Sequence, residues 1–128
     1  MINRAEYKNA LFIFNDNEDQ FLDESCSTGG GNAIIRPYQC EDPPRATGIS
    51  TGIYRQSSGQ NSGYTDLNDG NAKKVIDQGI NKIKKLISSN KYDKIIYSSD
   101  GKGGLGTGIF KVGDDVKKYI VDNLKKIV

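Results

Sequence analysis

Three glycine-rich loops are the part of this sequence that suggests chemistry most directly. Residues 28–32 read Thr-Gly-Gly-Gly-Asn, residues 48–52 read Gly-Ile-Ser-Thr-Gly, and residues 101–108 hold five glycines. Such loops expose consecutive backbone N–H groups, which form concave sites for phosphate oxygens. None has the strand, loop and helix order of a P-loop or a dinucleotide-binding fingerprint. The loops therefore predict a phosphate-bearing ligand, with tight turns as the alternative use of the glycines.

Two six-residue stretches repeat one pattern. Residues 50–55 and residues 106–111 share Thr-Gly-Ile, then an aromatic residue, then a base. Two such turns would place a hydroxyl, a backbone N–H, a stacking ring and a cation around one nucleotide-like ligand. Chance similarity is the alternative.

The candidate ligand-binding residues combine loop amides for phosphate, arginines for charge neutralisation, aromatic rings for stacking and polar side chains for ribose or base edges. They are Asn15, Asp16, Gly29, Gly30, Gly31, Asn32, Arg36, Thr51, Gly52, Tyr54, Arg55, Gly104, Gly106, Thr107, Gly108 and Phe110. Arg45 is a further candidate for charge neutralisation, and Tyr38 a further candidate for stacking.

A hydrolase acting on the same kind of ligand is the competing class. The chain has no histidine, so Asp16 or Asp100 would have to activate water, with Thr28 or Ser50 nearby. Both aspartates also fit a structural role at strand ends, and binding is preferred to catalysis. A third class is a protein-interaction module that docks through the lysine face of residues 72–87 and the final helix.

Composition excludes several other classes. Without histidine, and with only Cys26 and Cys40, the sequence predicts no metal site and no cofactor. The formal net charge is +2, too small to favour nucleic acid as a partner. No apolar run is long enough to span a bilayer, and residues 1–9 do not resemble a signal peptide. We therefore expect no membrane partner, a cytoplasmic location (the host cytoplasm if the chain is phage-encoded) and reduced thiols, with a disulfide as the alternative. A homo-oligomer is left open.

The elements that must position these residues belong to the α/β class. Residues 11–14 and 94–98 form short apolar strands, while residues 72–87 and the segment from residue 114 have helical periodicity. We expect one domain over residues 1–128, with a small mixed or parallel sheet and two main helices in the C-terminal half. The apolar segment 33–36 is expected to end at Pro37.

Residues 55–71 are mostly Gln, Ser, Gly, Asn and Asp, with only Tyr64 and Leu67 as plausible anchors. They predict a structureless stretch, either a mobile loop that acts as a lid or a disordered insertion. Tyr64 is the expected ligand contact of the lid. If the strands at 11–14 and 94–98 are parallel neighbours, residues 15–17 and 99–108 meet at one sheet edge and form one site. Antiparallel strands would separate them.

Residues 13–17, 29–33 and 49–54 together resemble the macro domain, in a rearranged order. They read Ile-Phe-Asn-Asp-Asn, Gly-Gly-Gly-Asn-Ala and Ile-Ser-Thr-Gly-Ile-Tyr. The resemblance covers roughly residues 11–54 in pieces and implies ADP-ribose binding. The chain is also similar to small phage and bacterial proteins. Their nearest functional analogue is the group of anti-defence sponges that trap cyclic ADP-ribose isomers, which implies sequestration of a nucleotide signal.

Overall fold

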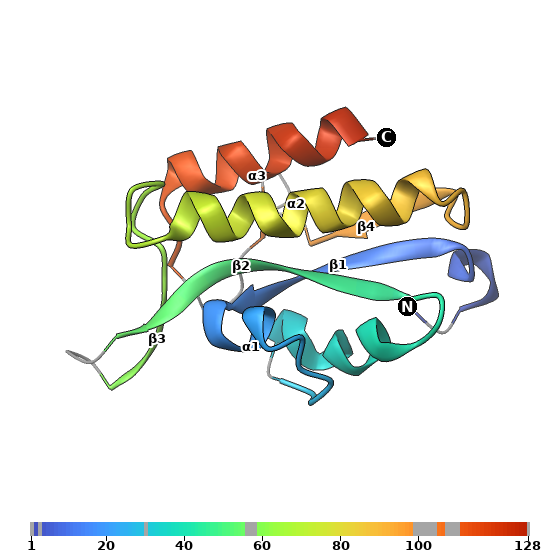
Figure 1. The fold of residues 1–128 in the computed structure, drawn as a ribbon, viewed down its shortest axis with the longest axis horizontal. Helices are drawn as coiled ribbons and strands as arrows, with labels where there is room; N and C mark the ends of the chain where they lie inside the picture. Colours follow the sequence, from blue (N-terminus) through green and yellow to red (C-terminus); the bar gives the residue numbers. More distant parts are fainter. Residues whose placement is uncertain are drawn as a thin grey trace.

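The computed structural model describes residues 2, 4–29, 31–55, 59–98, 105–106 and 111–127. Three strands lie within the first half of the chain, and two long helices lie within the second (Figure 1). The elements are η1 (Ala5–Tyr7), β1 (Ala10–Asn17), α1 (Glu18–Leu22), η2 (Gly31–Cys40), β2 (Ala46–Arg55), β3 (Gln60–Gly63), α2 (Ala72–Ser88), β4 (Lys94–Tyr97) and α3 (Asp114–Ile127), where η marks a 3-10 helix.

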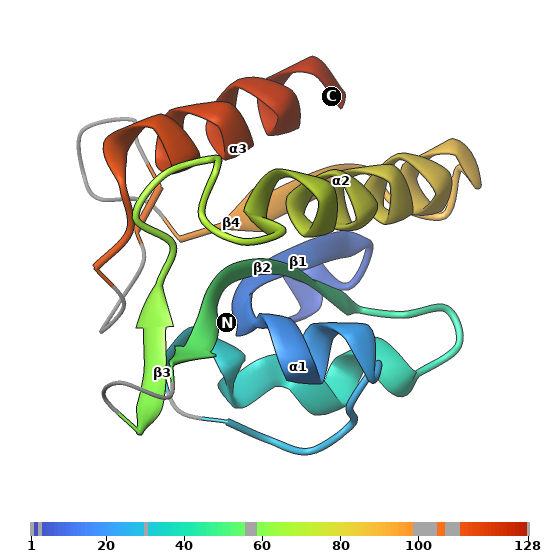
Figure 2. The same cartoon turned by 60° about the vertical axis from the view of Figure 1, so that its left-hand side comes forward.

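The four strands form one mixed sheet in the order β3-β2-β1-β4. The central strand β1 is parallel to β2 on one side and to β4 on the other, and β3 pairs antiparallel with β2. Helices α2 and α3 cover one face, and α1 and η2 lie on the opposite side (Figures 1 and 2). The predicted α/β class, with two main helices in the C-terminal half, is confirmed.

The strand β1 is apolar on both sides because both faces of the sheet are covered. Leu11 and Ile13 belong to the core under α2 and α3. Phe12 and Phe14 belong to a second core, which Ala33 of η2 joins. This arrangement explains why the sequence shows a continuous apolar run at this strand instead of an alternating pattern.

Helix α2 buries one stripe of side chains, as its periodicity predicts. The buried residues, at intervals of one, three and four, are Ala72, Val75, Ile76, Gly79, Ile80 and Ile83. Gly79 lets the helix approach the sheet closely, since a Cβ there would lie 3.2 Å from the Gly48 carbonyl oxygen. No helix among the described residues is both long and apolar enough to cross a membrane.

Three expectations about irregular segments are wrong, and residues 48–52, treated above as a glycine-rich loop, lie within strand β2. The stretch 55–71 is not structureless, because residues 60–63 form β3 and pair with the end of β2. Tyr64 is fully buried in the main core, so it is not an exposed lid contact. Pro37 does not end the segment that precedes it, since it lies inside η2. The fixed φ of proline is compatible with a 3-10 helix.

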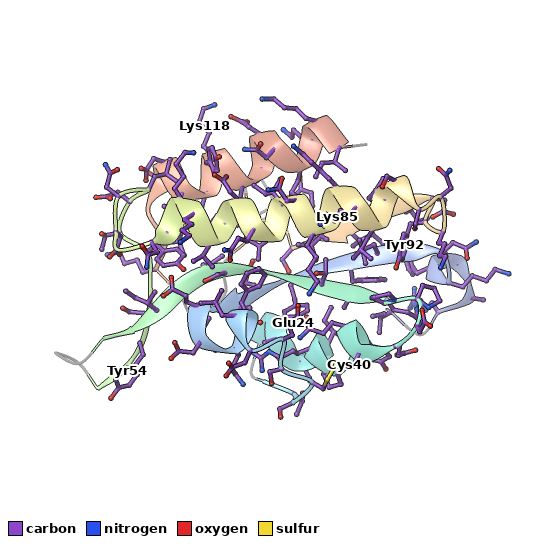
Figure 3. The ribbon with its side chains drawn as sticks, viewed as in Figure 1. Glu24, Cys40, Tyr54, Lys85, Tyr92 and Lys118 are labelled. Atoms are coloured by element: carbon purple, nitrogen blue, oxygen red, sulfur yellow. A yellow bond between two sulfur atoms is a disulfide. The ribbon has the colours of Figure 1, made fainter. Side chains whose placement is uncertain are left out.

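The expectation of reduced thiols is also corrected, since Cys26 and Cys40 form a disulfide. Cys26 lies in the segment after α1, and Cys40 is the last residue of η2. Their Cα atoms are 6.0 Å apart. Both cysteines are exposed, and Cys40 is seen at the lower side of the molecule in Figure 3.

Gly63 is expected to tolerate no side chain. A Cβ at this position would lie 2.4 Å from the Lys111 carbonyl oxygen and 2.9 Å from Val112 Cγ2. Because the first contact is backbone, Gly63→Ala must displace either β3 or the segment before α3. We expect a loss of about 1–3 kcal/mol in the free energy of unfolding, measured by urea denaturation. An unchanged unfolding midpoint would contradict this packing.

Candidate functional site

The carboxyl ends of three parallel strands meet at one side of the sheet. We call this place the carboxyl edge and define it by residues 15–17, 50–52, 98 and 105–106. Asn17 is the last residue of β1 in register with β2, opposite Gly52, and β4 pairs with β1 as far as Tyr97. β1 and β4 are therefore parallel neighbours, as the single-site prediction requires, and among the described residues that follow β4, Gly106 contacts Asn15.

The order of the strands changes direction at β1, because the chain adds β2 on one side of β1 and later adds β4 on the other side. The connection from β1 to β2 runs through α1 and η2, whereas the connection from the β2–β3 hairpin to β4 runs through α2. These connecting helices lie on opposite faces of the sheet (Figure 2). In open α/β sheets, ligands bind outside the carboxyl ends of strands at such a switch point. Here that point lies between β1 and β4.

Asn15 joins the two strands at the switch point. Its side-chain Nδ2 donates to the Gly106 carbonyl oxygen at 2.7 Å, and the Gly106 N–H donates to the Ser98 carbonyl oxygen at 2.9 Å. Leu105, next to this glycine, is buried in the main core. The described part of the late glycine loop is therefore fixed against the end of β1.

Replacing the Asn15 amide with a carboxylate should detach this loop. Aspartate cannot donate a hydrogen bond, so Asn15→Asp would place two oxygen acceptors against each other. We expect about 1–3 kcal/mol less stability, measured by urea unfolding. Asn9→Asp is the matched control, because Asn9 is an exposed residue just before the other end of β1. Equal losses of unfolding free energy in the two variants would contradict a stabilising Asn15–Gly106 hydrogen bond.

A buried ion pair lies beside the carboxyl edge. Arg36 donates from a terminal guanidinium nitrogen to Asp16 Oδ1 at 2.6 Å, and the Arg36 and Asp16 side chains are 2% and 0% exposed. Asp16 Oδ1 also accepts from the Asn17 N–H at 2.9 Å. The other terminal nitrogen of Arg36 donates to the Ser27 carbonyl oxygen at 3.0 Å. The positive charge of Arg36 is thus matched inside the protein.

Within the part of the chain that the structure describes, two atoms of this pair have no hydrogen-bond partner, Asp16 Oδ2 and Arg36 Nε. Gly29 packs on the guanidinium, since a Cβ at this position would lie 2.9 Å from Arg36 Nη1. The pair therefore connects the end of β1 to the first glycine loop. A buried polar atom without a hydrogen-bond partner is unusual in a folded protein.

A second group of polar side chains joins α1, β2 and the residue after β3. The Tyr64 hydroxyl lies 2.6 Å from Ser50 Oγ and donates to Glu18 Oε1 at 3.0 Å. Burial, with the nearby negative charge of Glu18, raises the pKa of Tyr64 well above its ordinary value. The hydroxyl therefore keeps its proton and remains a donor. Sequence reasoning missed Glu18, whose only local signal is its place in an acidic stretch.

The remaining candidates fall into two groups. Thr51 is buried, with its hydroxyl 3.5 Å from the Asp16 carbonyl oxygen, and Tyr54 is 53% exposed on the part of β2 that extends beyond β1. Figure 3 shows Tyr54 projecting at the β2–β3 hairpin. Arg45 lies at the opposite end of the sheet, where it donates to the Tyr7 carbonyl oxygen. Tyr38, whose carbonyl oxygen accepts from the Arg45 N–H, is with it there, so neither is at the carboxyl edge.

Some candidates lie outside the described residues: Gly30, Asp100, Gly104, Thr107, Gly108 and Phe110. For Gly31, Asn32 and Arg55 the structure describes only the element that contains them. A separate hollow of about 170 Å³ lies between α1 and α2. It is lined by Phe21, Leu22, Glu24, Gln78 and Lys82, so it contains none of the candidate ligand residues.

Comparison with known proteins gives one match. The sequence model of a family of unknown function (DUF7831) matches residues 3–122. The chain belongs to this family. The matched range begins before η1 and ends within α3, so it includes the four strands described here and the residues of the carboxyl edge. No match is found among curated proteins or among solved structures.

Proposed function

We propose that this DUF7831 protein binds a phosphate-bearing nucleotide derivative at the carboxyl edge and holds it without altering it. The observation that carries the proposal is the convergence of β1, β2 and β4 at a topological switch point. At that point, the Asn15 side chain on β1 donates to the carbonyl oxygen of Gly106, which follows β4, at 2.7 Å. Ligands of open α/β sheets bind in this position.

The residues around the edge support a ligand with both polar and aromatic parts. Backbone N–H groups of the first and last glycine-rich loops, residues 28–32 and 101–108, are the phosphate contacts in this proposal, which matters because the Arg36 charge is already paired with Asp16. Tyr54 offers an exposed ring for stacking on a base, a contact worth about 1–3 kcal/mol. The resemblance of residues 11–54 to the macro domain makes ADP-ribose and its cyclic isomers the first ligands to test, with cyclic oligonucleotides next.

Binding is favoured over hydrolysis by the state of Asp16. A general base must be within reach of the water that it activates, whereas the Asp16 side chain is fully covered and paired with Arg36. Sequestration of a nucleotide signal, as in a phage anti-defence protein, is the role that we propose for such binding.

Isothermal titration with ADP-ribose, cyclic ADP-ribose isomers and cyclic di- and trinucleotides tests the proposal. We expect saturable binding of at least one of them, with one ligand per chain. Mass spectrometry of the ligand recovered after denaturing the complex should then show it intact. Absence of binding to every ligand at millimolar concentration overturns the proposal, and recovery of a cleaved product replaces binding with hydrolysis.

A further inference from the structure

The hydroxyl chain from Ser50 through Tyr64 to Glu18 has no role in the proposed phosphate contacts. We propose that Glu18 determines specificity by accepting hydrogen bonds from the sugar hydroxyls of the ligand, and that Tyr64 positions it. This assignment rests on the proposed function, because it concerns the same carboxyl edge.

Tyr64 is a rigid support for a neighbouring side chain. It is fully buried, and its backbone is fixed on two sides. The Tyr64 N–H donates to the Thr51 carbonyl oxygen at 2.9 Å, and the Gly113 N–H donates to the Tyr64 carbonyl oxygen at 2.9 Å. Its hydroxyl therefore has a fixed position beside Ser50 of β2, where it meets Glu18.

The direction of the hydrogen bonds follows from the groups involved. An ionised carboxylate only accepts, and a tyrosine hydroxyl has one proton. Tyr64 thus donates to Glu18 Oε1 at 3.0 Å, and Ser50 donates to the Tyr64 oxygen at 2.6 Å. Among the described residues, Tyr64 is the only side chain that donates to Glu18. One carboxylate oxygen is therefore fixed, and the half-buried group keeps further acceptor positions for a ligand.

The position of Glu18 separates it from the phosphate contacts. It follows Asn17, which pairs with Gly52 of β2, whereas the Asn15 side chain donates to Gly106, which is hydrogen-bonded to Ser98 after β4. Strands in a sheet are spaced by about 4.8 Å, so β2 and β4 are roughly 10 Å apart across β1. A negative carboxylate repels phosphate and accepts from a sugar diol. The sugar therefore lies over β1 and β2, and the phosphates lie over β1 and β4.

The test compares Glu18→Gln with Asp19→Asn, a matched loss of one negative charge at the next, exposed residue. Titrations use ADP-ribose and inorganic pyrophosphate, which has phosphates but no sugar. We expect Glu18→Gln to weaken ADP-ribose binding at least tenfold and to leave pyrophosphate binding unchanged or stronger. Tyr64→Phe should weaken ADP-ribose binding several-fold, with pyrophosphate again unaffected. Asp19→Asn should change neither, and urea unfolding of each variant confirms that it is folded.

The outcomes separate this assignment from the proposed function. Wild-type protein that binds neither ADP-ribose nor pyrophosphate overturns the role of Glu18, and it overturns the proposed function as well if the cyclic ADP-ribose isomers and the cyclic oligonucleotides also fail to bind. Wild-type binding of ADP-ribose, with an affinity that Glu18→Gln changes less than twofold, overturns the role of Glu18 alone. Equal weakening of ADP-ribose and pyrophosphate by Glu18→Gln also overturns it, because the effect would not depend on the sugar.

Discussion

Replacing Asp16 with alanine is expected to lower the free energy of unfolding by about 3–5 kcal/mol. The change leaves the Arg36 guanidinium, 2% exposed, without its carboxylate partner. A buried charge without a partner is strongly destabilising, whereas the net contribution of the intact pair is smaller because both ions lost their hydration on folding. Urea denaturation measures the change.

Two comparisons isolate the buried charge as the cause. The double variant Asp16→Ala with Arg36→Leu should recover much of the loss, because it removes both charges. Glu6→Ala breaks the exposed Arg4–Glu6 pair, whose side chains are 70% and 60% exposed, and should change stability by less than about 1 kcal/mol. Similar losses for Asp16→Ala and Glu6→Ala would contradict the buried pair.

The second large effect concerns the disulfide. Opening the Cys26–Cys40 bond is expected to lower stability by about 3 kcal/mol, the value typical for a closed loop of this length. The bond spans 14 residues and joins the segment around Ser27 to the end of η2. Arg36 donates to Ser27 from the same helix, so reduction should also weaken ligand binding at the carboxyl edge.

Urea unfolding with and without a thiol reductant measures this effect. The double variant Cys26→Ser with Cys40→Ser should match the reduced protein and show no further response to reductant. An unfolding midpoint that reductant does not change in the wild-type protein would contradict a stabilising disulfide.

Strands β1 and β4 and helices α2 and α3 could be predicted because each has its own local signal. The apolar positions of α2 repeat at helical spacing, and the apolar run at 11–14 marks a strand with both faces covered. Strand β3 has no such signal. Its sequence, Gln-Asn-Ser-Gly, is polar throughout, and its pairing with β2 makes it a strand.

The site could be predicted only in part, for a similar reason. Parallel strands joined by helices bring their carboxyl ends together, which allowed residues 15–17 and 106 to be grouped. The partners of Asp16 and Tyr64 depend on contacts between residues that are distant in the sequence. Arg36 is 20 residues from Asp16, and Glu18 is 46 residues from Tyr64. No periodicity or spacing predicts such pairs.

Ligand binding at the carboxyl edge is tested by NMR titration of the ¹⁵N-labelled protein with ADP-ribose. We expect saturable shifts of the amide signals of Asn15, Asn17, Gly52 and Gly106. The amides of η1, at the other end of β1, should not move. Saturable shifts confined to η1 and Arg45, or no saturable shift anywhere at millimolar ligand, would contradict it.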